Sequence, residues 1–152
     1  MLQQLNNMTS KLTTWIARGL LLVSPIGFLD ATYLTLKHYA GQTVGCTITQ
    51  GCEIVTTSSY SVFYGIPVAL FGVLYYLLIV LLMIAYVDRK QENVIRLACW
   101  ITPVGFVASL YFVGIQAFVL QAWCQYCIGS AITSTLLFLL GMTYLATHKR
   151  SN

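Results

Sequence analysis

The chain has 152 residues, of which 58% are hydrophobic and only 8% are charged. Soluble domains carry about 25% charged residues, so this composition excludes a soluble globular protein and is typical of a membrane protein. The length suffices for a single membrane domain over residues 1–152, without an additional soluble module. The net charge of +4 is spread over terminal and loop positions, which disfavours a nucleic-acid-binding surface.

Apolar runs predict an all-α integral membrane protein, a bundle of four transmembrane helices, because each span needs about 20 apolar residues. The second run carries no charged residue between positions 66 and 87, and a later uncharged stretch separates Arg96 from Lys149. A polar break at 121–125 divides that stretch into two spans. The predicted helices lie near 15–39, 66–87, 95–120 and 124–146. Residues 3–14 show no convincing cleavage pattern, so no signal peptide is predicted.

The basic residues predict how the helices are oriented. Only Lys37 falls on one side of a four-span topology, and the other basic residues fall on the opposite side: Lys11, Arg18, Arg89, Lys90, Arg96, Lys149 and Arg150. The positive-inside rule then places both termini and the loop between the second and third helices in the cytoplasm. The loop 40–65 and the turn 121–125 are predicted to face outside.

Two cysteine pairs are therefore predicted on the outer face, where disulfides persist. Cys124 and Cys127 share a face at a helix start, where partial positive charge favours a thiolate, the attacking species in disulfide exchange. Cys46 and Cys52 lie in a loop rich in glycine and threonine that is free to move. The alternative interpretation is two structural disulfides, or buried thiols at the second pair. Cys99 is predicted to pack within the third helix.

Three further features bear on the site. Asp30 is the only acid inside a predicted span, and such acids serve a function or pair with another group. Apolar residues at 54, 55, 62 and 63 predict a short amphipathic surface helix in the first outer loop, which would cap the bundle. His38 and His148 do not lie at metal-ligand spacing from cysteine or acid, so both are interpreted as interfacial residues and no metal site is predicted.

Several motifs together resemble the bacterial homologues of vitamin K epoxide reductase over about residues 18–147. They are Cys46-x5-Cys52, Ser58 six residues later, Phe63 to Gly72 with its Gly65-Ile66-Pro67, Cys124-x-x-Cys127, and Asp30 to Thr35. The resemblance implies a four-helix bundle around a quinone of the menaquinone, ubiquinone or phylloquinone type. It also implies that Cys127 lies next to the quinone with Cys124 as its disulfide partner, that Cys52 exchanges with Cys124, and that Cys46 meets an outside protein.

The quinone pocket is expected to be apolar with a few polar contacts. Ser58 is implied by the resemblance to help cover this pocket, and Asp30 is a candidate polar contact. The aromatic candidates are Phe28, Phe71, Phe112 and Phe118, each of which alternatively faces lipid or the core.

The resemblance implies a quinone-dependent thiol oxidoreductase of the cell (inner) membrane that supports disulfide bond formation. Its implied partner is a separate extracytoplasmic thioredoxin-fold (DsbA-like) protein, because the chain ends at Asn152 without the fused thioredoxin-like domain of many bacterial members. Cys127 is followed by Ile128 and Gly129, whereas the animal enzymes carry Thr-Tyr-Ala there. This departure disfavours epoxide reduction and leaves quinone reduction unaffected.

Three other classes fit parts of the sequence. The DsbB type of quinone-coupled enzyme also has four helices and two cysteine pairs, but its pairs come in the reverse order. A transporter could use the four thiolates to capture a soft metal ion. A structural membrane subunit could carry the cysteines as stabilising disulfides.

Overall fold

The computed structural model describes the backbone of residues 2–151 and the side chains of residue 4 and residues 7–148. Within this part of the chain, four helices are long and apolar enough to cross a membrane. They are α1 (Leu2–Tyr39), α3 (Val68–Arg89), α4 (Glu92–Gly114) and α5 (Gln125–Ser151), and a π-helix η2 (Ile115–Leu120) extends α4. The prediction of an all-α bundle with four spans is confirmed.

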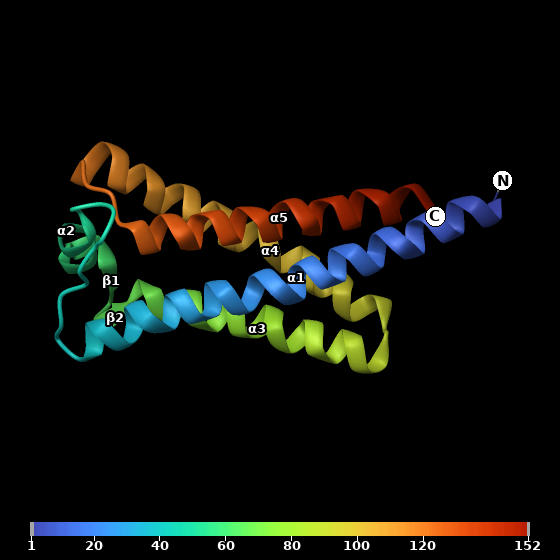
Figure 1. Ribbon diagram of the computed structural model, residues 1–152, viewed down its shortest axis with the longest axis horizontal. Helices are drawn as coiled ribbons and strands as arrows, with labels where there is room; N and C mark the ends of the chain where they lie inside the picture. The colour runs from blue at the N-terminus through green and yellow to red at the C-terminus, as the bar shows by residue number, and fades with distance from the viewer. Residues whose placement is uncertain (1, 152) are drawn as a thin grey trace.

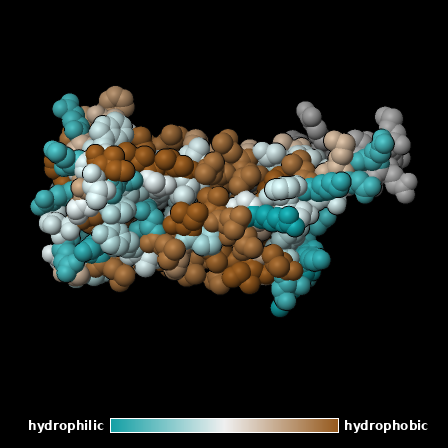
Figure 2. All heavy atoms as spheres, viewed as in Figure 1, coloured by the Kyte–Doolittle hydropathy of each residue, from teal (hydrophilic) through white to brown (hydrophobic). Residues whose placement is uncertain are grey.

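The four helices form an elongated bundle in which α1 packs against α3 and α5, and α4 packs against α5 and α3 (Figure 1). Both termini and the α3–α4 turn lie at one end, and the segments that join α1 to α3 and α4 to α5 lie at the other. Figure 2 shows hydrophobic residues gathered in a broad band between two more hydrophilic ends. The chain is therefore a multi-pass membrane protein.

One buried core joins all four spans. It contains Leu20 of α1, Tyr76 of α3, Ile95 of α4 and Leu137 of α5, among other buried side chains. Cys99, early in α4, is fully buried in this core, apart from the cluster that holds the other four cysteines. Its position agrees with the predicted packing role.

A small cap covers the bundle at the end opposite the termini (Figure 1). It consists of α2 (Cys52–Thr57), the 3-10 helix η1 (Ser59–Ser61), and a hairpin of β1 (Val62–Phe63) and β2 (Ile66–Pro67). The predicted surface helix is thus present, but it is only six residues long and does not include residues 62 and 63.

The hairpin corrects one predicted helix boundary. Residues 66 and 67 pair with β1, so α3 begins at Val68 rather than at 66. Tyr64 and Gly65 make the two-residue turn with φ of 51° and 81°. Positive φ at both central residues matches the right-handed twist of a hairpin, and it costs glycine little but is uncommon for tyrosine.

The other boundaries also differ from the predicted ones. The first helix begins at Leu2, well before the predicted 15, because an apolar run marks where a span lies and not where a helix starts. The third begins at Glu92, and its last turn is the π-helix η2. The last helix runs to Ser151 instead of 146.

Candidate active site

The structure brings all four predicted cysteines together at the capped end of the bundle. Cys46 and Cys52 form a disulfide, and Cys124 and Cys127 are free thiols. Cys52 and Cys124 are 1% and 0% exposed and lie in one buried apolar cluster, against which Cys46 and Cys127 also pack. Segments about 70 residues apart in sequence thus place two cysteine pairs side by side.

Close approach of two backbone segments brings the pairs together. Gly51, just before α2, lies against the segment that leads into α5. A Cβ at this position would stand 2.5 Å from the nitrogen and 2.8 Å from the oxygen of Trp123. Only a residue without a side chain allows this contact, which places Cys52 beside the segment that carries Cys124.

A buried glutamine in η2 holds that segment in place. Gln116 is 2% exposed, and its Oε1 accepts a hydrogen bond from the backbone N–H of Cys124 at 2.9 Å. Its backbone carbonyl accepts a further one from the N–H of Ala122 at 3.2 Å. Gln121, with φ of 48°, turns the chain at the end of the π-helix. These bonds satisfy backbone groups that would otherwise be buried without partners.

Cys124 caps the start of α5 with its sulfur. The Sγ atom accepts the backbone N–H of Cys127 at 3.4 Å, and the Cys124 carbonyl accepts the N–H of Ile128 at 3.0 Å. A hydrogen bond from the Cys127 thiol, joined by the backbone N–H groups of Cys127 and Tyr126, lowers the pKa of Cys124 to about 7 even though burial opposes the shift. A thiol with this pKa is both an available nucleophile and a good leaving group near neutral pH.

We predict that Cys124 titrates near pH 7 in the protein with its Cys46–Cys52 disulfide formed. Thiolate absorbance at 240 nm should appear as the pH rises through about 7, because a lowered pKa favours the charged form at lower pH. The Cys127→Ala variant loses the largest cause of the shift, so its midpoint should move upward. The Cys124→Ala variant should lack the transition, and a transition that persists in it would contradict the assignment.

The two residues between Cys124 and Cys127 both make contacts outside α5. The Gln125 Oε1 accepts hydrogen bonds from the backbone N–H of Thr47 at 3.2 Å, from its hydroxyl at 3.3 Å, and from the N–H of Ile48 at 3.0 Å. The Tyr126 ring packs against Tyr33 of α1 with centroids 5.1 Å apart. The Cys-x-x-Cys is thereby connected to the loop that carries Cys46 and to the first helix.

A hydroxyl group also contacts the outer pair. The Thr49 Oγ1 donates a hydrogen bond to the Cys46 sulfur at 3.0 Å. Hydrogen bonds to sulfur favour the thiolate over the thiol, so Thr49 can stabilise Cys46 when its disulfide opens.

Polar groups line the bundle interior next to the second pair. Asp30 is half-buried, and no residue in the described part of the chain hydrogen-bonds to its buried Oδ2. Its carboxyl group lies within electrostatic range of Cys124, Cys127 and Tyr76. The Tyr76 hydroxyl lies 2.8 Å from the Thr133 hydroxyl and donates to the Ser130 carbonyl at 2.8 Å.

Sequence reasoning identified Asp30 but missed Tyr76, Ser130 and Thr133. Ser130 and Thr133 follow Cys127 at intervals of three on α5, so they share its helix face. Hydroxyl residues at this spacing within an apolar span were the available signal.

The predicted aromatic candidates and Ser58 lie in separate places. The Ser58 hydroxyl donates to the Val55 carbonyl at 2.8 Å at the end of α2. Phe71 is 46% exposed with its ring centroid 6.4 Å from that of Phe63, and half-buried Phe112 lies edge-on to Tyr111. Phe28 packs on the core and Phe118 is 85% exposed. Their quinone contacts stay predictions.

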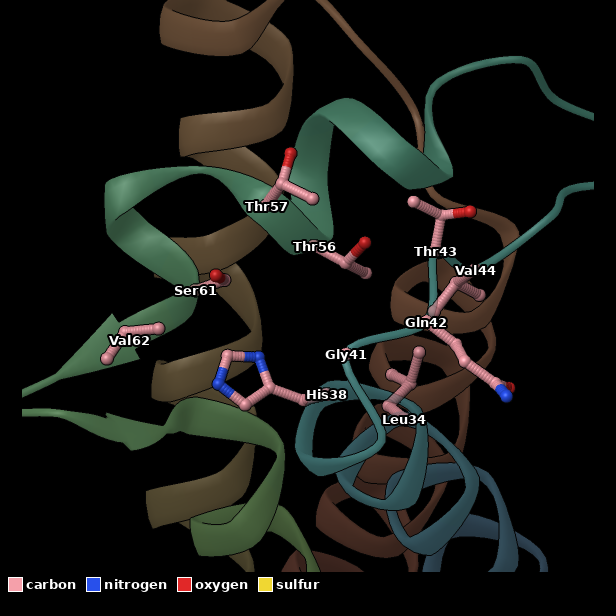
Figure 3. A pocket seen from close by; sticks show the side chains of 10 residues that line it. All are labelled: Leu34, His38, Gly41, Gln42, Thr43, Val44, Thr56, Thr57, Ser61 and Val62. Atoms are coloured by element: carbon pink, nitrogen blue, oxygen red, sulfur yellow. The ribbon is translucent and has the colours of Figure 1, made fainter.

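A pocket of about 250 Å³, lined by both hydroxyl and aliphatic side chains, opens beside the cysteine cluster. Figure 3 shows His38 of α1 facing into it, between the residues after α1 and those of α2, η1 and β1. Leu34 and Val44 line the pocket and also belong to the cysteine cluster. Cofactor sites are mostly about 300–1,000 Å³, so this pocket is small for a quinone.

Fold and site together define a multi-pass membrane protein with two adjoining cysteine pairs at one end of its helical bundle. Residues 19–142 match the model of the vitamin K epoxide reductase family. Because the match covers most of the 152 residues, the chain belongs to this family. It is accordingly a membrane thiol oxidoreductase of the quinone-linked kind.

Proposed function

We propose that this protein takes electrons from a reduced thioredoxin-fold protein and passes them to a membrane quinone, thereby supporting disulfide bond formation. The proposed route runs through Cys46 and Cys52 and then through Cys124 and Cys127. The observation that supports it most strongly is that Cys52 and Cys124, from the two pairs, are buried in one cluster.

The relay needs only exchange between neighbouring sulfurs. A donor thiolate attacks the Cys46 sulfur of the outer disulfide and releases Cys52 as a thiolate. Cys52 then attacks Cys124 in an inner disulfide and releases Cys127. The second donor thiol displaces Cys46, which attacks Cys52 and frees Cys124. The donor leaves as a disulfide, the outer disulfide is restored, and the inner pair holds two electrons as two thiols.

The properties of Cys124 suit this sequence of steps. Leaving-group pKa governs exchange rates, and a thiol of lower pKa leaves faster. Cys124 leaves in the last exchange, and its pKa of about 7 favours that step at neutral pH.

The residues beside Cys127 fit a quinone. A bound quinone supplies the final acceptor of two electrons and two protons. Asp30 is the residue best suited to hold a proton for it, because its buried Oδ2 has no hydrogen-bond partner among the described residues. Cys127 and Asp30 would border the ring of the quinone. Phe71 and Phe112 stay the predicted apolar contacts, and Ser58 stays the predicted cover.

We further propose that the active site faces the outer side of the cell (inner) membrane. Lys11, Arg18 and Arg96 lie on the helical parts toward the end that holds the termini and the α3–α4 turn, as do Arg89 and Lys90 at that turn. The positive-inside rule assigns this end to the cytoplasm and the cysteines to the opposite face. The shared core supports residues 1–152 as one membrane domain.

The direct test is quinone reduction by purified protein with a reduced thioredoxin-fold donor. Turnover is the expected result. A parent protein that turns over with no quinone would contradict the proposal and favour a structural role for the cysteines. If the cysteines bind metal instead, a soft metal ion should protect the four thiols from alkylation. Among the described residues, no cluster of three His, Cys, Asp or Glu side chains is suited to hold a metal.

We predict that Gly51→Ala slows transfer between the pairs. The new Cβ would overlap the Trp123 backbone, so the two segments must separate. Displacement of reacting groups by about 1 Å can cost about 100-fold in rate, and we expect a fall of about 10- to 100-fold in turnover. Gly45→Ala is the matched control, because a Cβ there meets nothing within 4 Å. Equal rates in the two variants would contradict the role of this contact.

A further inference from the structure

We propose that Gln125 is a positioning residue of the relay, whose side-chain oxygen holds the Cys46 arm, residues 46–52, against the start of α5. This inference rests on the proposed function and adds a residue to it. Gln125 directly follows Cys124, and its hydrogen-bond partners Thr47 and Ile48 directly follow Cys46. The tether therefore joins the immediate neighbour of one cysteine pair to that of the other.

The tether fixes the end of the arm that Gly51 does not reach. Gly51 anchors one end against Trp123, next to Cys52. At the other end, residues 42–46 have no regular secondary structure, and Ile48 is 86% exposed. With few packed side chains there, three hydrogen bonds to one oxygen hold the Cys46 end of the arm close to Cys124.

The chemistry of the contact defines which substitutions preserve it. All three partners are donors, two N–H groups and one hydroxyl, so position 125 must supply an acceptor. Glutamate keeps an acceptor at the same reach, whereas methionine keeps the length and loses it. Thr47 and Ile48 are exposed, so water can satisfy their N–H groups when the tether is lost. The loss should therefore change the exchange rate more than the stability.

The test compares Gln125→Met and Gln125→Glu in quinone reduction by a reduced thioredoxin-fold donor. We expect kcat to fall about 10- to 100-fold for methionine without a rise in the KM for the donor, because misplaced sulfurs react slowly while Cys46 becomes more accessible. The Gln125→Glu variant should show the parent rate when the variants are compared at pH values that give an equal thiolate fraction of Cys124. Gln50→Met, at an exposed glutamine in the same arm, is the matched control.

A second readout does not depend on quinone. In a Cys52→Ala/Cys127→Ala background, the stability of a Cys46–Cys124 disulfide in glutathione buffers measures how close the tether holds the Cys46 end of the arm to Cys124. Gln125→Met should weaken this disulfide by about the factor seen in kcat, and Gln125→Glu should not. The tether would be contradicted by a disulfide of unchanged stability in Gln125→Met or by a parent-like kcat of that variant. Equal losses in Gln125→Met and Gln125→Glu would also contradict it. A parent that fails to reduce quinone while the disulfide responds as expected contradicts only the proposed function.

Discussion

We expect Cys127→Ala to reduce quinone at least about 1000-fold more slowly than the parent with every donor, because groups that act as a unit fail together. Without Cys127 no inner disulfide can form, so Cys52 has no bond to open at Cys124. Electrons then stop at the outer pair and do not reach position 127, which shares its face of α5 with Ser130 and Thr133. Stopped-flow absorbance of the quinone measures the rate.

Cys99→Ala is the matched control for this loss. Cys99 is equally free of disulfide bonding and fully buried, but it lies in the core that joins the four spans. Its variant should lose some stability and keep turnover. A Cys127→Ala protein with the parent rate would remove Cys127 from the relay, and equal loss in both variants would point to damaged folding.

The second large effect is expected for a thioredoxin-fold donor but not for a small dithiol. Cys46→Ala should lower turnover with a thioredoxin-fold donor by at least about 1000-fold. The same variant should retain turnover with a small dithiol. Cys46 is the more exposed sulfur of the outer disulfide, so it is the atom that a large partner can reach. In its absence Cys52 is a free thiol that still exchanges with Cys124, and a small dithiol can resolve the resulting disulfide.

This variant is assayed with both donors in the same preparation, so that the small dithiol reports on the integrity of the inner pair. Thr49→Val serves as a milder comparison, because it removes only the hydroxyl that contacts the Cys46 sulfur. Retained turnover with the protein donor in Cys46→Ala would assign the partner-facing role to another residue.

Much of the fold was predictable because the membrane environment restricts which structures can cross it. A bilayer requires long apolar helices, and the uncharged runs reveal them directly. The wrong helix boundaries lie where the local backbone conformation determines the structure. Tyr64 adopts a positive φ that its residue type does not predict, and the resulting hairpin removes residues 66 and 67 from α3.

The meeting of the cysteine pairs was predictable from topology, but the contacts that position them were not. Gln125 bonds to residues 77 and 78 positions away, and Gly51 meets Trp123 across a similar separation. No local pattern encodes such pairings. Gln116 is an amide in an apolar span, which indicates a polar contact in the interior. That its partner is the backbone N–H of Cys124 emerges only from the fold.

The quinone contacts were the least predictable part of the site. Phe71 and Phe112 are predicted from residue type alone, which does not distinguish a pocket wall from a lipid-facing surface in a membrane protein. Phe71 proves to be 46% exposed. Polar residues in spans are more informative, since a buried carboxyl or hydroxyl is costly in lipid unless it has a partner or a function.

The central claim is that Cys52 and Cys124 exchange directly, and trapping their disulfide tests it most directly. Protein carrying Cys46→Ala and Cys127→Ala is oxidised in membranes, digested and analysed by mass spectrometry for peptides joined through these residues. The account predicts a Cys52–Cys124 disulfide in most molecules and far less Cys52–Cys127 disulfide in the matched Cys46→Ala/Cys124→Ala protein. Free Cys52 and Cys124 in the first variant, or equal yields in both, would contradict the relay.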